Sequence, residues 1–173
     1  PQEFDKEQWK DALTQCLEHF EPTILEHYKH GLSQKMGLPS FHKDSFDCAM
    51  AFLRILQSEQ LDYTQSFIRL QNKEYEVLQD DCLDRFQFEN FLAQYQAIRN
   101  GQDLTELDAE MQKVNPHYIL RNHMAQKAIE LAERNDFSEV DRLFELLSQP
   151  FTKQIDLEKS GDLAPLPSDV PEV

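Results

Sequence analysis

Arg121 and Asn122 are the polar side chains best placed to do chemistry, because they lie in a stretch otherwise rich in leucine, isoleucine, methionine and alanine. If this stretch is a helix with an apolar face, one of the two side chains points inward. A guanidinium binds phosphates and carboxylates through paired hydrogen bonds. Arg121 is therefore expected to reach an anion elsewhere in a larger protein, or to anchor a carbonyl or acidic side chain of this chain. The second role is the commoner one, so Arg121 and Asn122 are candidates for a structural or interdomain polar contact.

His27 and His30 form a second candidate pair, three residues apart on a predicted helix with Glu26 beside them. Side chains at this spacing can face one metal ion, but a zinc site needs three or four protein ligands. Surface histidines on an acidic helix are the favoured interpretation. Asp80 and Asp81 lie in an acidic segment that lacks the glycine of a calcium-binding loop, so no metal site is predicted.

The three cysteines, Cys16, Cys48 and Cys82, are far apart and form no CxxC pair. This pattern indicates reduced thiols in a cytosol-like compartment, where small buried side chains are the expected role. Cys16 has His19 one turn further on, yet it shares an apolar face and is expected in the core. The sequence contains no glycine-rich phosphate loop, so no catalytic or cofactor-binding residue is predicted.

Charge and hydropathy exclude two classes of partner. The 32 acidic residues against 17 basic ones give a net charge of −15, which repels nucleic-acid phosphates and anionic lipid headgroups. No apolar run approaches the roughly 20 residues of a membrane-spanning helix, and no signal peptide is visible. A cytoplasmic location is expected, or a mitochondrial one in a eukaryote. Because the chain begins with Pro1 and not with Met, we expect a piece of a longer protein.

The residue composition predicts an all-α fold. Leucine occurs 22 times, whereas valine, isoleucine and threonine together number 17, and only four glycines are present; this choice favours helix over strand. We expect an irregular helical domain of six to eight helices in residues 1–150, followed by an extended, proline-rich acidic tail in residues 151–173. Apolar residues at spacings of three and four place the longer helices at about 5–20, 23–36, 44–58, 82–100 and 136–149. A short helix is expected at about 107–113, and a loop with a helical turn at 71–81.

Several helix ends are predicted from local chemistry. Proline inside a helix removes a hydrogen bond, so Pro22 is expected to end the first helix and Thr23 to cap the second. Gly37 suits the position just past a helix end. Asn115 and Pro116 have the types expected at a helix start, as cap and first residue. A short helix through Leu70 is expected to be capped by Asp62 or Thr64.

Two further features concern the last helices. Ala125, Ala128 and Ala132 form a small-residue face that allows another helix to approach closely. Asp136 and Glu139 have the spacing of a capping box, so they are expected to begin the final helix, which Pro150 closes.

Several short segments follow one another along the chain: residues 28–38, ending in Lys35-Met36-Gly37-Leu38; Leu61-Asp62-Tyr63-Thr64; 91–95; Val114-Asn115-Pro116; Leu120-Arg121-Asn122; and 138–151. In this order they resemble the C-terminal part of the SelO/YdiU family. Phe91 takes the place of a tryptophan that is usual in that family.

The resemblance implies that the parent protein has a protein-kinase-like fold and transfers AMP from ATP, with Mg or Mn, to hydroxyl groups of target proteins. It places the phosphate-binding residues, the metal ligands and the catalytic base in an upstream core, and none of them maps onto this chain. A cysteine-bearing C-terminal tail of the family is also not matched here. This chain is then expected to be a non-catalytic helical domain whose partners are the upstream core and protein substrates.

Two alternatives remain open from the sequence. The chain could be a stand-alone acidic helical module that recruits proteins, or a small metal-dependent enzyme that uses His27 and His30.

Overall fold

The structure, a computed structural model, describes residues 6–40 and 42–164. Within these residues the chain forms eight helices and no strand, which confirms the predicted all-α class. None of the helices combines the length and apolar character needed to cross a bilayer. The helices are α1 (Lys6–Lys35), α2 (Ser45–Ser58), α3 (Tyr63–Gln71), α4 (Tyr75–Asp80), α5 (Arg85–Arg99), α6 (Leu104–Val114), α7 (Asn122–Ala132) and α8 (Ser138–Ser148).

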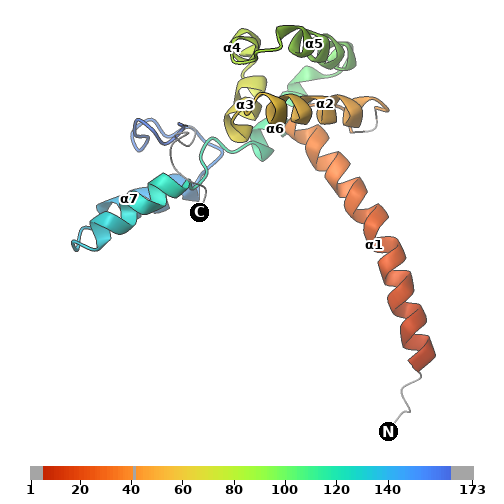
Figure 1. Ribbon diagram of the computed structural model, residues 1–173, viewed down its shortest axis with the longest axis horizontal. Helices are drawn as coiled ribbons and strands as arrows, with labels where there is room; N and C mark the ends of the chain where they lie inside the picture. The colour runs from red at the N-terminus through yellow and green to blue at the C-terminus, as the bar shows by residue number, and fades with distance from the viewer. Residues whose placement is uncertain (1–5, 41, 165–173) are drawn as a thin grey trace.

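The helices are arranged as a central body with two projections (Figure 1). Helices α2 to α6 form the body, and α1 extends from it as a single long rod. Helices α7 and α8 pack on each other in a separate arm on the other side. The open space between the rod and the arm gives the molecule a bracket-like outline.

The larger hydrophobic core lies in the central body. Helix α2 packs on α5, and the C-terminal end of α1 packs on α2 and α6. Phe52 stacks on Phe91 with ring centroids 4.9 Å apart, and Phe67 meets Phe52 edge to face at 5.4 Å. From α1, Leu32 contributes to this core, so most of the rod lies outside it.

A second, smaller core holds the arm together. It contains Tyr118, Met124 and Ala128 from the α7 side and Leu143 and Leu146 from α8. Leucines of the irregular segment 150–164 pack against it. Of the predicted alanine face of α7, Ala128 lies in this core, whereas Ala125 and Ala132 are only half-buried.

Helix α1 runs through Pro22 without ending, so the predicted break at Glu21-Pro22 is wrong. The Thr23 hydroxyl does not cap a new helix; it donates to the His19 carbonyl, 2.7 Å away, within the same helix. A proline in a helix interior costs about 3 kcal/mol, but here the apolar face keeps one phase on both sides of Pro22. A single unbroken helix therefore keeps all of these apolar side chains on one side.

Asn115 and Pro116 do not start a helix, which corrects the second boundary prediction. Asn115 lies at the C-terminal end of α6, where its amide donates to the Met111 carbonyl at 3.0 Å. Its side-chain amide donates to the carbonyl of Lys35, the last residue of α1, at 2.7 Å. The polar side chain is used to join two helix ends, and α7 begins only at Asn122.

The capping box predicted for α8 is also absent. The Asp136 carboxylate accepts from the Ser138 amide at 3.0 Å, but Glu139 is buried and turns toward Arg142 instead of back to the helix start. A charge-assisted hydrogen bond from the Arg142 guanidinium is stronger than one from a backbone amide, which explains why Glu139 points toward Arg142.

Two of the three cysteine predictions are correct and one is wrong. Cys48 and Cys82 are buried as expected, whereas Cys16 is exposed on α1. The expectation that Cys16 packs in a core was wrong because nothing in the described chain covers that part of α1.

Gly37 ends α1 in the left-handed region, with φ of +59°. Arg99 donates to the Gly37 carbonyl at 2.8 Å and to the Tyr95 hydroxyl at 2.9 Å, and it pairs with Asp108. A Cβ at position 37 would run into the Arg99 guanidinium and the Met111 sulfur. Glycine is therefore needed at this position both for its backbone conformation and for the space it leaves.

Candidate functional site: two apolar faces and the polar contacts behind them

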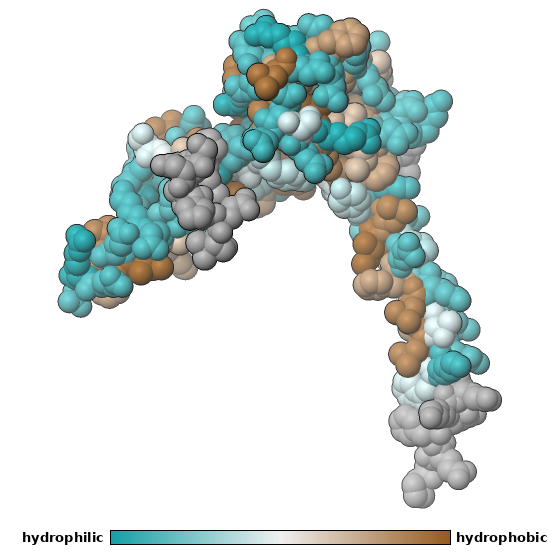
Figure 2. All heavy atoms as spheres, viewed as in Figure 1, coloured by the Kyte–Doolittle hydropathy of each residue, from teal (hydrophilic) through white to brown (hydrophobic). Residues whose placement is uncertain are grey.

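The first candidate surface is the apolar face of α1. Side chains at spacings of three and four lie on one side of the helix and are half or more exposed: Leu13 is 59% exposed, Leu17 71%, Phe20 62% and Ile24 50%. Figure 2 shows hydrophobic residues along the edge of α1 that faces the open side of the molecule. We call Leu13, Leu17, Phe20 and Ile24 the α1 stripe. The sequence pattern identified this face, but it predicted a core position for it.

The second candidate surface is a groove on the arm, with a volume of about 410 Å³. Ile129 is 53% exposed and Phe144 74% exposed, which is unusual for large apolar side chains beside a core. We call this surface the α7–α8 groove. It is lined by Leu120, Ala125, Ala128, Ile129, Val140, Leu143, Phe144, Leu147 and Ser148.

Arg121 joins the arm to the central body. Its guanidinium donates two hydrogen bonds to the Asp62 carboxylate, at 2.7 and 3.1 Å, across 59 residues of sequence. Both side chains are largely buried. The same carboxylate accepts from the Gln65 amide at 2.8 Å and so caps α3. Asn122 lies beside Arg121 as the exposed first residue of α7.

The Asp62 carboxylate is held in its charged form. Burial opposes ionisation, but hydrogen bonds from Arg121 and from the Gln65 amide outweigh it, so the pKa of Asp62 lies below its ordinary value. Removing the partner of a buried carboxylate of this kind is costly, because the charge is then left buried and unpaired. Because one group both caps α3 and holds Arg121, the geometry ties the start of α3 to the start of α7.

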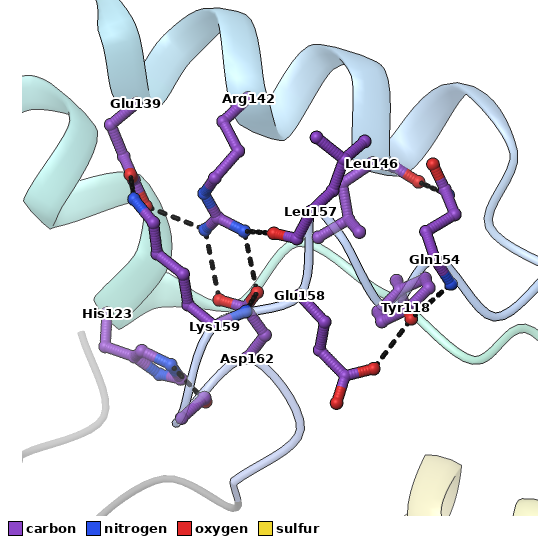
Figure 3. A network of polar contacts seen from close by, with 11 residues as sticks. Tyr118, His123, Glu139, Arg142, Leu146, Gln154, Leu157, Glu158, Lys159 and Asp162 are labelled. Carbon is purple, nitrogen blue, oxygen red and sulfur yellow. Dashed lines mark hydrogen bonds and ion pairs between the residues drawn. The ribbon is translucent and has the colours of Figure 1, made fainter.

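A denser polar network fastens segment 150–164 to α8 (Figure 3). Arg142 donates to Asp162 at 2.7 and 3.1 Å, to Glu139 at 2.7 Å and to the Leu157 carbonyl at 2.7 Å. Lys159 pairs with the second oxygen of Glu139. The two carboxylates are 3% and 5% exposed, so two buried acids are matched by two cations, Arg142 and Lys159.

The network shifts the pKa values of Glu139 and Arg142. The hydrogen bond from Arg142 lowers the pKa of Glu139 to about 2, against the opposing effect of burial, with a further contribution from Lys159. Burial disfavours the charged form of Arg142, but Glu139 and Asp162 raise its pKa above the ordinary value. Glu139 and Arg142 therefore stay charged at neutral pH.

Tyr118 extends the network to the loop before α7 (Figure 3). Its hydroxyl donates to Glu158 at 2.8 Å and accepts from the Gln154 amide at 2.9 Å. The Gln154 side chain donates to the Leu146 carbonyl at 2.8 Å. Together these bonds fix segment 150–164 along one side of the arm and so shape the arm that carries the groove.

Sequence reasoning missed this network almost entirely. Glu139 and Arg142 are three residues apart on one helix, which is a detectable signal for an ion pair. Asp162 and Lys159 carry no such local signal, because they approach α8 only through the path of the irregular segment.

The histidine pair is not part of a metal site in the described chain. His27 lies exposed on α1, and His30 contacts the Ser40 hydroxyl at 2.9 Å. Among residues 6–40 and 42–164, no three side chains of His, Cys, Asp or Glu are grouped so as to hold a metal ion. The buried arginines Arg99, Arg121 and Arg142 already bind carboxylates.

Comparison with known proteins identifies the family. The family described as "Protein adenylyltransferase SelO" matches residues 8–148 of the chain. The chain belongs to the SelO family. This confirms the resemblance inferred from the short segments.

Two curated relatives, both called "Protein nucleotidyltransferase YdiU", extend the comparison. The protein of Pectobacterium atrosepticum is 38% identical over 165 residues, which cover 92% of this chain and 34% of the relative. The protein of Pectobacterium carotovorum subsp. carotovorum is 36% identical over 163 residues, covering 91% and 33%. The SelO-family chain thus spans about a third of the length of the curated relatives that it matches.

Proposed function

We propose that this chain is the non-catalytic C-terminal helical part of a SelO/YdiU-type enzyme, and that it docks on the rest of that enzyme through the α1 stripe. The parent enzyme would transfer AMP from ATP, with Mg or Mn, to hydroxyl groups of proteins. ATP, metal and catalytic residues would belong to the upstream, kinase-like part. The role of the chain described here would be structural. It could in addition dock protein substrates or regulate the activity of the parent enzyme.

The exposed α1 stripe is the observation that carries this proposal. Helix α1 has 30 residues, about 45 Å at 1.5 Å per residue, and only its last turns enter the core. An exposed apolar face of this length is a typical interaction surface. Since the chain spans about a third of its relatives' length, the remainder of such a protein is the natural partner for that face.

A first experiment tests the non-catalytic role. The isolated chain is incubated with labelled ATP, Mg or Mn and a general protein acceptor, beside the full-length protein. We expect AMP transfer only from the full-length protein. Transfer by the isolated chain would overturn the assignment.

A second experiment tests the docking surface. Leu17→Asp is introduced in the isolated chain and in the full-length protein, and unfolding is followed in urea. Because Leu17 is exposed here, the isolated chain should change little, whereas the full-length protein should lose about 2 kcal/mol, the value of burying one leucine. Leu83→Asp is the matched control, since Leu83 is 96% exposed and lies outside the stripe.

A separate protein partner is the alternative occupant of the stripe. The net charge of −15 would suit a stand-alone module that recruits basic proteins. An equal loss of stability from both variants, or none from either in the full-length protein, would favour this alternative.

A further inference from the structure

The α7–α8 groove differs from the α1 stripe in its charge. Helical geometry places Glu130 and Glu133 on the solvent side of Ile129, and Asp141 and Glu145 on the solvent side of Phe144. All four acids are exposed. The apolar floor of the groove therefore lies between two acidic rims, one on each helix.

The dimensions of the groove suit a helix. Helices α7 and α8 have 11 residues each, so the groove between them is about 16 Å long at 1.5 Å per residue. This length matches three turns of a helix laid between two others. An amphipathic helix in an apolar groove is a common mode of recognition, read through side chains three and four apart.

We propose that the α7–α8 groove binds an amphipathic helix from the upstream part of the same protein, with an apolar ridge flanked by lysine or arginine. This inference rests on the proposed function, because it places a second contact of the chain on the same upstream part. Acidic rims attract basic flanks and disfavour acidic ones.

The charges argue against a second copy of this chain as the occupant. Each copy carries a net charge of −15, and a symmetric contact would set acidic rims against acidic rims. The arrangement of the molecule favours an intramolecular helix. Hydrophobic residues are visible on both α1 and the arm (Figure 2), so one folded upstream part could contact both.

The test measures access to one position in the groove. Phe144→Cys is made in the full-length protein and in the isolated chain, and maleimide labelling at position 144 is timed by peptide mass spectrometry. Phe144 is 74% exposed, so the change should not disturb the arm. We expect labelling at least tenfold slower in the full-length protein. Leu83→Cys, with its position outside both surfaces, should label at the same rate in both.

A charge-reversed variant tests the rims. Asp141→Lys with Glu145→Lys should bring labelling of position 144 in the full-length protein back toward the rate in the isolated chain. A neutral pair, Asp141→Asn with Glu145→Gln, should have a smaller effect. If Asp141→Lys with Glu145→Lys leaves the slow labelling rate unchanged, the proposal that basic residues flank the bound helix is wrong.

Two outcomes overturn the inference outright. Equal labelling of position 144 in both proteins would show that the upstream part leaves the groove open. Slow labelling already in the isolated chain would assign the groove to another copy or to a segment of the chain itself. Cys16, exposed beside the α1 stripe, reports on the proposed function in the same experiment. If Cys16 is protected and position 144 is not, only the groove proposal fails.

Discussion

Replacing Glu139 by glutamine should weaken the attachment of segment 150–164 to α8. Glu139 is buried and binds both Arg142 and Lys159. Glutamine has the same size and can still accept one hydrogen bond, but it removes the negative charge that these two cations share. The arm, with its small core, should therefore lose stability while the central body keeps it.

The magnitude follows from the protonation of Glu139. Its pKa falls from 4.5 to about 2 in the folded chain, and a tenfold change in proton affinity corresponds to about 1.4 kcal/mol. The charged form of Glu139 thus contributes about 3 kcal/mol. Because the folded pKa is the lower one, this stability is fully present above about pH 4.5 and is lost as the pH falls toward 2.

Methyl NMR signals of Leu143 and Leu146 in urea give the required local readout, since both leucines lie in the core of the arm. At pH 7, Glu139→Gln should lower the unfolding free energy of the arm by about 3 kcal/mol. At pH 2.5 wild type and variant should differ much less, because the unfolded chain already binds the proton at that pH and most of the stability from the charged form is lost. Glu145→Gln, an exposed change on the same helix, is the control.

Three results would refute this reasoning. The first is a difference below about 0.5 kcal/mol at pH 7, which is within the range of ordinary surface changes. The second is a difference that stays constant down to pH 2.5. The third is an equal effect of Glu145→Gln, which would mean that removal of any acid from α8 has the same consequence.

Two further predictions concern the central body. Gly37→Ala should destabilise the chain by about 2–4 kcal/mol in thermal or urea unfolding, because φ is positive and Arg99 occupies the space. Gly31→Ala, in open space on a helix, should instead stabilise it by about 0.5–1 kcal/mol, and equal effects would contradict the argument. Arg121→Ala should cost about 3–5 kcal/mol by leaving Asp62 buried and unpaired, whereas Asp62→Asn with Arg121→Met should cost clearly less in the same assay.

Features that depend on neighbours within one helical turn could be predicted. The 3.6-residue apolar period identified nearly all the helices, because it is a property of a few adjacent turns. Asp62 as the cap of α3 and Gly37 after α1 were also expected, since a cap bonds to amides two or three residues away. The apolar face of α1 was recognised by the same period.

Features that depend on distant partners were predicted poorly. Asn115 has the residue type of a helix cap, but it bonds to a carbonyl 80 residues earlier. Pro22 has the type of a helix breaker, but the helix continues through it. In both cases a local preference of 1–3 kcal/mol gave way to an arrangement that the local pattern does not contain.

By itself, the sequence determined the helical class, the positions of most helices, the acidic character and the resemblance to SelO, all of which are local or compositional. The tertiary structure decided which charges meet. Of the 32 acidic residues, Asp162 and Glu139 pair with Arg142, and Asp62 pairs with Arg121. The physical reason is that an ion pair needs contact within a few ångströms, and only the folded path of the chain brings distant residues that close.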